Sequence, residues 1–506
     1  GLWWGSPGVA ARKRRRPYHG WVRIAEEQPK DGTVTTTDQK TPRFYLAMLA
    51  SKAAVGALDL RHHRGGQVPG VVAEKIDPDF LSHIDKPDHV VFVSGTNGKT
   101  TTTNLLSDLL VDNGYGLVTN RAGGNICTGI ESTLIKNAAV SGAQRESYAV
   151  MELDEVSFRP VLPRLEPELL LVTNLYTDTF TRSADPDDVF GIMSRHISEN
   201  TRLVLNADDL ISCRMAPQNH NKVFFSIEAT LPDDTPDPQG IVCDLTACPV
   251  CGGRLEYDYC HLRHLGRAHC ASCGLTNPEA QYVMTSVDLD AHTFTVEERL
   301  VDGHPRHDYH FGTYTVANLY NLFAATVAAR EMGLTPEQIA RSLDGKVNIT
   351  AERYSERTVE GRRIVNIASK GENGTATSVA FDTIRKEPGT KAVVLMLSDA
   401  HMAEHPTEVE FSGWIYQADY EYLVDPQVKQ VIVVGDTATD QVLRMCLAGV
   451  DPSLVTQADG IAEAMAAVRY DDVDTTFIAF CVSNVDVARG AADMLATRIE
   501  GAHHER

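Results

Sequence analysis

The stretch HVVFVSGTNGKTTTTNLL, residues 89–106, decides the fold of this 506-residue chain. An apolar, β-branched run at 90–93 predicts a buried strand, the glycines at 95 and 98 predict a turn, and the segment from Thr100 is compatible with a helix. Glycines in such a turn let backbone N–H groups converge on phosphate oxygens at the positive end of the helix. The stretch therefore predicts a phosphate-binding loop. The residues expected to bind phosphates are Gly95, Thr96, Asn97, Gly98, Lys99, Thr100 and Thr101.

The loop fits a short form of the phosphate-loop pattern. A full Walker A motif would need glycine at Val93, so only the shorter form G-T-x-G-K-T is present. In this form Lys99 supplies a mobile cation for the phosphates, and Thr100 can place its hydroxyl on Mg²⁺.

Acidic residues follow the next apolar run. The segment SYAVMELDEVSF, residues 147–158, leads into Glu152, Asp154 and Glu155. Carboxylates at a strand end beside a phosphate loop are suited to holding Mg²⁺ or its water ligands. The segments 169–182 and 202–209 repeat the pattern of a buried strand that ends in polar residues. Such strands, alternating with helical stretches, predict a parallel α/β sheet with its ligand at the carboxyl edge.

Composition and charge narrow the class of protein. The formal charge of −21 would repel a polyanion, so we expect no nucleic-acid partner. No apolar run approaches the roughly 20 residues that cross a bilayer. Ten cysteines with one dense cluster suit a reducing compartment, which predicts a cytoplasmic protein. Residues 1–40 are polar with a basic run and are expected to form a disordered tail.

The dense cluster has the spacing of a zinc ribbon. Two C-x₂-C pairs, separated by eighteen residues, comprise Cys248, Cys251, Cys270 and Cys273. Four sulfur ligands leave no open position for water, so the predicted role of Zn²⁺ is structural. Other side chains in the same segment are alternative ligands: Cys243, Cys260, His261, His264 and His269.

Five segments in order resemble the Mur ligases: GTNGKTTTT, MELDE, TNLYTD, LNADD and NLYNLFAATVAA. Mur ligases join an amine to a carboxylate through an acyl phosphate made from ATP. The resemblance implies that Lys99 and Thr100 bind the ATP phosphates and Mg²⁺. It implies further that Glu152 holds a second Mg²⁺, and that Asn318 and Asn321 lie near the adenine. The two asparagines are one helical turn apart and so share a face.

A Cys₄ ribbon within the ATPase domain resembles one branch of this family, the MurT subunits. The segments LAMLASKAAVGALDLRHHRGGQVPGVVAEKIDP at 46–78 and NRAGGNICTGI at 120–130 are similar to that branch as well. The resemblance implies amidation of the D-glutamate α-carboxyl of lipid II in peptidoglycan biosynthesis, at the cytoplasmic face of the membrane. The cysteines outside the ribbon region lie in no G-x-C-x-G elbow, so a separate GatD-like glutaminase is the expected partner.

The C-terminal half restarts the strand pattern at about residue 351, in the segments RRIVNIASKGENG, KAVVLMLSDAH, VKQVIVVGDTATDQVLRMCLAGV and TTFIAFCVSN. The resemblance implies that Arg353 and Lys370 approach the ATP phosphates. It also implies an acid that orients the catalytic histidine of the glutaminase. The segment SDAHMAEHPTEVEFSGWIYQADYE places Glu410 at that position when aligned on Ser412, and Asp399 is the other acid available.

The predicted fold is α/β, with a Mur ligase-like central P-loop ATPase domain, an inserted Cys₄ zinc ribbon and a C-terminal Rossmann-like α/β domain. The expected divisions are a tail at 1–40, a short lead-in at 41–85, the central domain at 86–345 with the ribbon at about 243–282, and the C-terminal domain at 346–506. Two other functions stay open. One is a Mur-type ligase that joins an amino acid to a carboxylate, and the other is a zinc-ribbon nucleotide-binding module without amide chemistry.

Overall fold

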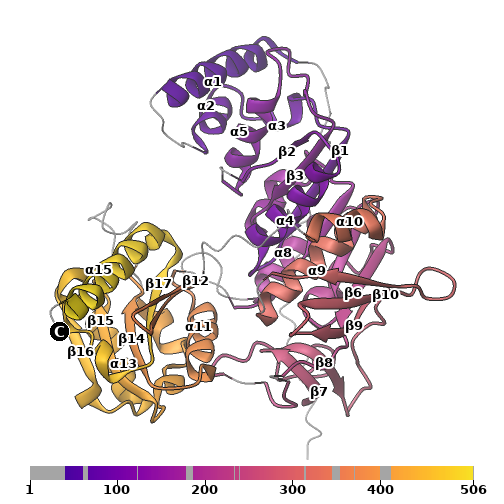
Figure 1. Ribbon diagram of the computed structural model, residues 1–506. Coiled ribbons are helices and arrows are strands. Elements are labelled where there is room, and N and C mark those ends of the chain that lie inside the picture. Colours follow the sequence, from indigo (N-terminus) through magenta and orange to yellow (C-terminus); the bar gives the residue numbers. More distant parts are fainter. Residues whose placement is uncertain are drawn as a thin grey trace, which may run out of the picture. The chain divides into compact units, whose positions relative to one another are not determined.

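The computed structural model describes residues 40–60, 66–121, 124–177, 186–232, 234–238, 240–312, 315–344, 354–369, 371–398 and 412–504. Figure 1 shows helices at the start of this part, followed by a large sheet, a small hairpin and a second sheet flanked by helices. Both sheets are built mainly from parallel strands.

The first helices are α1 (Pro42–Leu60), α2 (Val68–Ile76) and α3 (Phe80–His83). The rings of Phe44 and Phe80 stack with their centroids 5.3 Å apart and are fully buried. Helix α2 also packs on α5 (Cys127–Asn137), where a Cβ added to Gly70 would lie only 2.0 Å from the carbonyl oxygen of Thr128. The small side chain therefore sets how closely these two helices approach.

The larger sheet has the strand order β11-β10-β9-β6-β5-β4-β1-β3-β2. The strands from β9 to β2 in this order run parallel to their neighbours, and β10 and β11 add an antiparallel edge. Their bounds are β1 (His89–Ser94), β2 (Leu117–Val118), β3 (Tyr148–Glu152), β4 (Leu169–Val172), β5 (Arg202–Asn206), β6 (Lys222–Ile227), β9 (Tyr282–Asp288), β10 (Thr293–Glu298) and β11 (Arg306–His310).

Side chains of β1 alternate between two apolar layers. Val91 and Val93 pack with Leu105 of α4 (Lys99–Asp112), whereas Val90 and Phe92 belong to the layer on the other face. Helices on both faces of a parallel sheet require such continuously apolar strands. The further helices of this region are α6 (Phe158–Val161), α8 (Pro186–His196), α9 (Val316–Glu331) and α10 (Pro336–Leu343), with 3₁₀ turns at Glu155–Ser157 and Ser212–Arg214.

A hairpin of β7 (Leu255–Leu262) and β8 (Leu265–Cys270) interrupts this sheet in sequence but not in space. Strands β6 and β9 pair directly, so the chain leaves the sheet after Ile227 and returns to it at Tyr282. The intervening segment is an insertion that contains the four ribbon cysteines.

The second sheet has the order β12-β13-β17-β14-β15-β16, and only the pairing of β12 with β13 is antiparallel. Its strands are β12 (Tyr354–Val359), β13 (Arg362–Ser369), β14 (Lys391–Met396), β15 (Val428–Val434), β16 (Val455–Ala458) and β17 (Thr475–Cys481). The accompanying helices are α11 (Gly374–Lys386), α13 (Ala438–Ala448), α14 (Ile461–Ala467) and α15 (Val485–His504), with 3₁₀ turns at Ser412–Gln417, Tyr420–Leu423, Pro452–Leu454, Tyr470–Asp472 and Val482–Asn484.

The α/β class with parallel sheets is confirmed for both halves of the chain. The proposed domain boundaries stay a prediction. Among the helices of the described ranges, none combines the length and the hydropathy that crossing a bilayer requires.

Candidate functional site

The predicted phosphate loop connects β1 to α4, so the expected order of strand, turn and helix is confirmed, while its binding of phosphate stays a prediction. Gly95 and Gly98 adopt φ angles of 125° and 83°, which side chains rarely tolerate. Added Cβ atoms would lie 2.3 Å from the Thr173 hydroxyl oxygen and 2.0 Å from Asn321 Oδ1. Both glycines are therefore required by conformation and by space.

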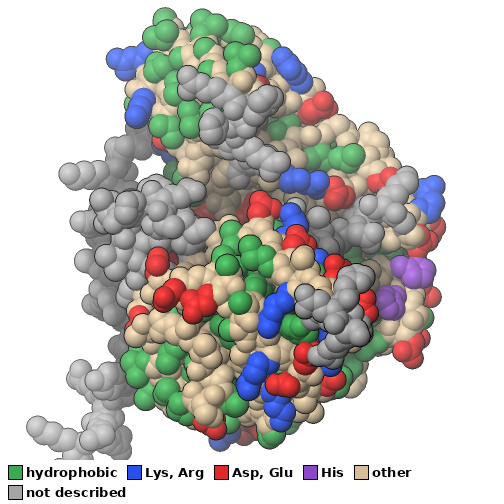
Figure 2. All heavy atoms as spheres, turned by 60° about the vertical axis from the view of Figure 1, so that its left-hand side comes forward, with side chains coloured by type: hydrophobic (Ala, Val, Ile, Leu, Met, Phe, Trp, Pro, Cys, Tyr) green, Lys and Arg blue, Asp and Glu red, His purple; other side chains and the backbone are tan. Residues whose placement is uncertain are grey.

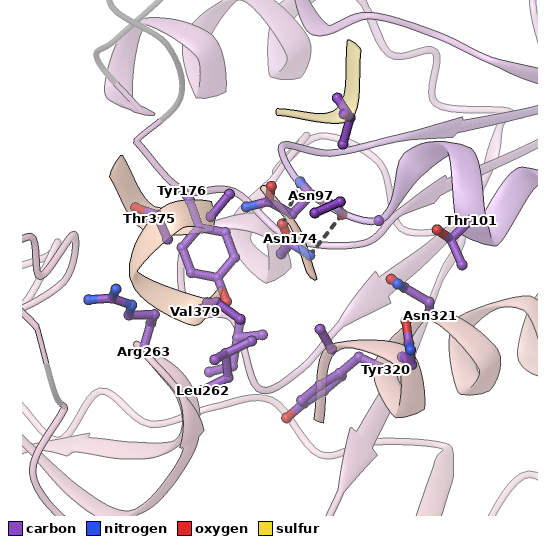
Figure 3. Close-up of a pocket in the computed structure, with 17 residues that line it drawn as sticks. Asn97, Thr101, Asn174, Tyr176, Leu262, Arg263, Tyr320, Asn321, Thr375 and Val379 are labelled. Carbon is purple, nitrogen blue, oxygen red and sulfur yellow. Dashed lines mark hydrogen bonds between the residues drawn. The ribbon is translucent and has the colours of Figure 1, made fainter. Parts of the chain in front are cut away.

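The end of β4 holds the loop in place. The backbone N–H of Asn97 donates to Asn174 Oδ1 at 3.0 Å, and Asn174 Nδ2 donates to the Asn97 carbonyl at 3.1 Å (Figure 3). The N–H of Thr96 donates to the Asn174 carbonyl at 2.9 Å, and the Thr173 hydroxyl donates to the Asn97 carbonyl at 2.7 Å. These bonds fix the loop before any ligand arrives.

Lys99 folds back into this loop. Its Nζ donates to the Gly95 carbonyl at 2.5 Å and to Glu155 Oε1 at 2.8 Å, and both side chains of the ion pair are buried. Burial raises the pKa of Glu155, and the neighbouring ammonium of Lys99 opposes that rise. The carboxylate thus compensates the lysine charge in the place where a phosphate would do so.

Oxygen ligands gather on the other side of the loop. The Thr100 hydroxyl donates to Glu152 Oε2 at 2.6 Å, and Asn125 Nδ2 donates to Glu152 Oε1 at 2.7 Å. These three side chains line one cavity together with Asn120 and Arg121. Hydroxyl and carboxylate oxygens are the hard donors that Mg²⁺ prefers, so the residues present fit that ion.

A pocket of about 180 Å³ adjoins the loop (Figure 3). Helix α9 contributes Asn318 and Asn321, so the two asparagines share one wall, as their spacing predicted. The loop side and strand ends contribute Asn97, Gly98, Thr101, Asn174 and Tyr176. The pocket combines amide groups with apolar surface, a combination typical of small-molecule sites.

Two walls of this pocket are formed by residues that the sequence did not indicate as part of a binding site. The end of β7 and the turn after it supply Leu262 and Arg263, and helix α11 supplies Thr375, Ala376 and Val379. The ribbon segment was interpreted as purely structural, because its spacing reveals a metal site but not what its hairpin touches. No local sequence signal could have placed Leu262 beside Asn318.

The hairpin turn is bound firmly on both sides. Arg263 Nη2 donates to Asp419 Oδ2 at 2.9 Å, in a pair that is almost fully buried. His264 Nε2 lies 3.1 Å from Asp209 Oδ1 at a fully buried position. Although burial opposes it, hydrogen bonding and the charge of His264 lower the pKa of Asp209. The turn is therefore fixed by the Arg263–Asp419 ion pair and by a buried hydrogen bond of His264, as well as by packing.

The four ribbon cysteines meet at one point. Their sulfur atoms all lie within 4.8 Å of one another, and the pairs Cys248–Cys273 and Cys251–Cys270 are both 3.6 Å apart. A regular tetrahedron with Zn–S bonds of about 2.3 Å places its sulfurs roughly 3.8 Å apart, so the donor set fits zinc. The alternative ligands do not belong to this group, and Cys260 Sγ lies 2.8 Å from the Arg263 carbonyl.

Four predicted site residues lie outside the described residues: Arg353, Lys370, Asp399 and Glu410. Their roles stay predictions.

Comparisons with known proteins agree with this arrangement. The Mur ligase middle domain matches residues 93–238, and the MurT ligase C-terminal domain matches residues 371–482. The lipid II isoglutaminyl synthase (glutamine-hydrolyzing) subunit MurT of Staphylococcus aureus strain COL is 29% identical over 421 residues, which cover 82% of this chain and 90% of that protein. The subunit of the same name from Streptococcus pneumoniae is 25% identical over 440 residues, covering 86% and 93%.

Solved structures share the fold. A pseudomurein peptide ligase type C from Methanothermus fervidus superimposes with a TM-score of 0.62 at 19% identity, covering 82% of this chain and 80% of that one. MurF ligase from Thermotoga maritima, solved in complex with ADP, gives a TM-score of 0.51 at 15% identity, covering 86% and 85%.

The phosphate loop on a parallel sheet, followed by a second α/β unit, defines a ligase of the Mur type. Within that class the chain is similar to the MurT subunits, which match it over more than four fifths of its length, and its residues 371–482 match the MurT ligase C-terminal domain.

Proposed function

We propose that this chain is the synthetase subunit of an enzyme that amidates the α-carboxyl of D-glutamate in the lipid II stem peptide, giving D-isoglutamine. The proposal is carried by the MurT relatives, whose names specify lipid II isoglutaminyl synthesis and glutamine hydrolysis. It places the chain in peptidoglycan biosynthesis, at the cytoplasmic face of the membrane.

The phosphoryl donor in this proposal is ATP. The N–H groups of the loop and the N-terminus of α4 bind the ATP phosphates. The ammonium group of Lys99 then moves away from Glu155 and pairs with these phosphates. Because burial already raises the pKa of Glu155, the carboxylate that Lys99 leaves can take up a proton. The adenine occupies the pocket beside Asn318 and Asn321.

Thr100 and Glu152 are the residues that would hold Mg²⁺. When bound, the ion neutralises charge on the phosphate oxygens. Asn125 keeps the Glu152 carboxylate oriented through its hydrogen bond. Arg353 and Lys370 are proposed to approach the same phosphates from the C-terminal half.

The reaction divides into two transfers. A carboxylate oxygen of the acceptor attacks the γ-phosphorus, and ADP leaves with the electrons of the broken bond, so an acyl phosphate forms. The nitrogen of ammonia then bonds to the acyl carbon, phosphate leaves, and the nitrogen loses a proton. Ammonium has no free electron pair for this attack, so the nitrogen must arrive as ammonia.

We propose that a separate GatD-like glutaminase supplies that ammonia. A glutaminase nucleophile must be a thiolate. Burial raises the pKa of Cys213, and burial together with Glu131 and Glu74 raises the pKa of Cys127 to about 12. These environments hold both thiols protonated. Glu410, or Asp399 in its place, is proposed to orient the histidine of the partner.

The zinc ion is proposed to be structural. Backbone N–H groups of Val250 and Gly253 donate to Cys248 Sγ at 3.5 Å and Cys251 Sγ at 3.4 Å, which stabilises thiolates around a cation. Bound zinc would close the knuckle from which the β7–β8 hairpin extends.

The decisive experiment compares nitrogen sources. The purified chain, alone or with its glutaminase, is given ATP, Mg²⁺ and lipid II, and the product is followed by mass spectrometry. With ammonium salts, we expect the lone chain to convert the α-carboxyl group of the acceptor to an amide. With glutamine, we expect the same product only when the glutaminase is present. Turnover of glutamine by the lone chain would refute the proposal of a separate glutaminase. Ligation of an amino acid in place of ammonia would favour a Mur-type peptide ligase.

A further inference from the structure

Helix α1 is apolar on every side. Its nineteen residues include only three charged side chains: Arg43, Lys52 and Asp59. One face packs into the protein through Phe44, Ala47, Met48 and Ser51. The opposite face is also apolar, and Leu46, Leu49 and Leu60 are 59%, 54% and 85% exposed. A surface helix normally exposes polar residues to water, and this face exposes leucines instead.

Helix α2 extends the apolar surface. It is joined to α1 by a hydrogen bond from the Ser51 hydroxyl to the Pro69 carbonyl at 2.9 Å, and it exposes Val68 and Val71. The described part of the chain exposes twenty large hydrophobic side chains. Six of them lie between residues 45 and 71: Tyr45, Leu46, Leu49, Leu60, Val68 and Val71. Figure 2 shows hydrophobic side chains gathered over the N-terminal helices, with Lys and Arg beside them. Such a concentration marks an interaction surface.

Positive charge accompanies this surface. Helices α1 and α2 together hold three Lys and Arg against two Asp and Glu, whereas the whole chain has a formal charge of −21. Lys52 Nζ lies 3.4 Å from the Lys136 carbonyl oxygen, which brings a second basic residue next to α1. Burial, followed by the nearby charge of Arg145, lowers the pKa of Lys52. Three basic residues, Arg43, Lys52 and Lys75, thus belong to the two helices of this surface.

We propose that the exposed faces of α1 and α2 form a docking surface for an anionic lipid bilayer. Leu46, Leu49 and Leu60 enter the boundary between head groups and acyl chains, and the basic residues meet the head groups. The contact is interfacial, since none of the described helices is suited to cross a membrane. The inference rests on the proposed function in one respect, because a lipid-linked acceptor gives the surface its purpose.

Charge disfavours two other occupants. A second copy of the chain would bring the same basic region against itself, and like charges across an interface repel. Residues 1–40 contain eight Lys and Arg against four Asp and Glu, so they carry the same sign as the surface. An anionic bilayer is complementary in both charge and hydrophobicity.

Docking at this surface would act on the proposed site through α5. The N–H of Gly70 in α2 donates to the Ser132 hydroxyl of α5 at 2.8 Å. Helix α5 starts directly after the segment of Asn125, whose side chain binds Glu152. The helices that face the bilayer are therefore packed directly against the element that leads to the proposed magnesium ligands.

The test is co-sedimentation of the full chain with vesicles, without ATP or acceptor. We expect binding to vesicles of phosphatidylcholine with phosphatidylglycerol, weak binding to phosphatidylcholine alone, and weakening by salt. The double variant Leu46→Ser/Leu49→Ser should lose at least about tenfold in affinity, because two partly buried leucines are removed from the contact. The matched control is Leu443→Ser/Leu447→Ser in α13, whose leucines are 51% and 68% exposed and should not matter.

Equal vesicle binding by the first variant and the wild type, with both equally stable to heat, would overturn the inference. So would a wild-type dimer that this variant dissociates in sedimentation velocity, since the face would then bind a second copy. Amidation of an acceptor without its lipid tail separates the two proposals. A wild type that amidates it but ignores vesicles refutes the docking surface alone, whereas vesicle binding without amidation refutes the proposed function alone.

Discussion

Each of the two sheet regions contains a buried lysine that pairs with a carboxylate, and the two lysines lie at opposite ends of their strands. Lys99 begins α4 after the carboxyl end of β1, and it pairs with Glu155. Lys391 is the first residue of β14, is fully buried, and pairs with Asp425 at 3.0 Å. Ligands of open α/β sheets bind at the carboxyl ends of strands. Lys99 lies at the ligand edge, and Lys391 lies at the opposite end of its strand.

The partner carboxylates differ in the same sense. Burial raises the pKa of Glu155, whereas hydrogen bonds from the Gln427 N–H and from Lys391, although opposed by burial, lower the pKa of Asp425. Lys391 also donates to the Gln427 side chain at 3.1 Å and the Arg385 carbonyl at 3.3 Å. Both lysines also donate to backbone carbonyls, so the difference between them lies in the acid: the pKa of Glu155 is raised, and the pKa of Asp425 is lowered.

The largest expected effect is on ATP cleavage by Lys99→Ala. Loss of one donor to the transferring phosphoryl group should slow cleavage by roughly 10²–10³-fold, about 3–4 kcal/mol. Stability should change little, because Glu155 can become protonated. The measurement is single-turnover cleavage of radiolabelled ATP together with thermal unfolding.

Lys391→Met is the matched control. It should leave cleavage unchanged and destabilise the protein by about 1–3 kcal/mol, since Asp425 loses its ion pair. If both lysine variants lost only stability, Lys99 would be as structural as Lys391.

A third buried titratable side chain, Glu131, differs from both lysine–carboxylate pairs because other acids lie next to it. Burial, then Glu74, raises the pKa of Glu131 from its ordinary 4.5 to about 9, against the opposing charge of Arg164. The folded chain therefore keeps a proton that the unfolded chain releases, so stability falls as pH rises from about 4.5 to about 9.

Glu131→Gln mimics the protonated acid and should remove that slope, which is at most about 1.4 kcal/mol per pH unit. Urea unfolding at pH 6 and pH 8 measures it. Parallel pH profiles for variant and wild type would show that Glu131 is ionised in the folded protein.

The smallest effects are expected from removing the partner carboxylates. Glu155→Gln leaves Lys99 without its counter-charge until phosphate arrives, so added ATP and Mg²⁺ should raise the melting temperature more than in the wild type. Asp425→Asn should cost about 1 kcal/mol, and ATP should not restore it. The Asp425 effect should fade at acidic pH, because a lowered pKa contributes stability only while the carboxylate is ionised. Equal responses to ATP in thermal-shift assays would remove the distinction.

Local patterns were enough to predict the strand, loop and helix around Gly95–Thr101, because each depends on residues close in sequence. The cysteine pairs were equally readable, since two tight turns bring their own ligands together. The asparagines of α9 were placed on one face by helical spacing, though their pocket was known only through the family resemblance. The roles of Arg353, Lys370, Asp399 and Glu410 remain predictions.

Other features had no local signal. The wall formed by Leu262 and Arg263 depends on the insertion between β6 and β9 folding back beside α9. The charge compensation of Lys99 by Glu155 joins residues 56 positions apart. The sequence placed helix α1 only in a short lead-in, and its packing alone reveals that one apolar face stays exposed.

The sequence by itself determined the α/β class, the phosphate loop and the cysteine knuckle, because backbone conformation and short-range spacing specify them. Only the tertiary structure decided which buried lysine lies at the carboxyl edge of its sheet, which hairpin lines the pocket beside the loop and which apolar surface remains exposed. These depend on contacts between segments far apart in the chain, and the free energy of such contacts comes from burial and partner geometry that no single segment contains.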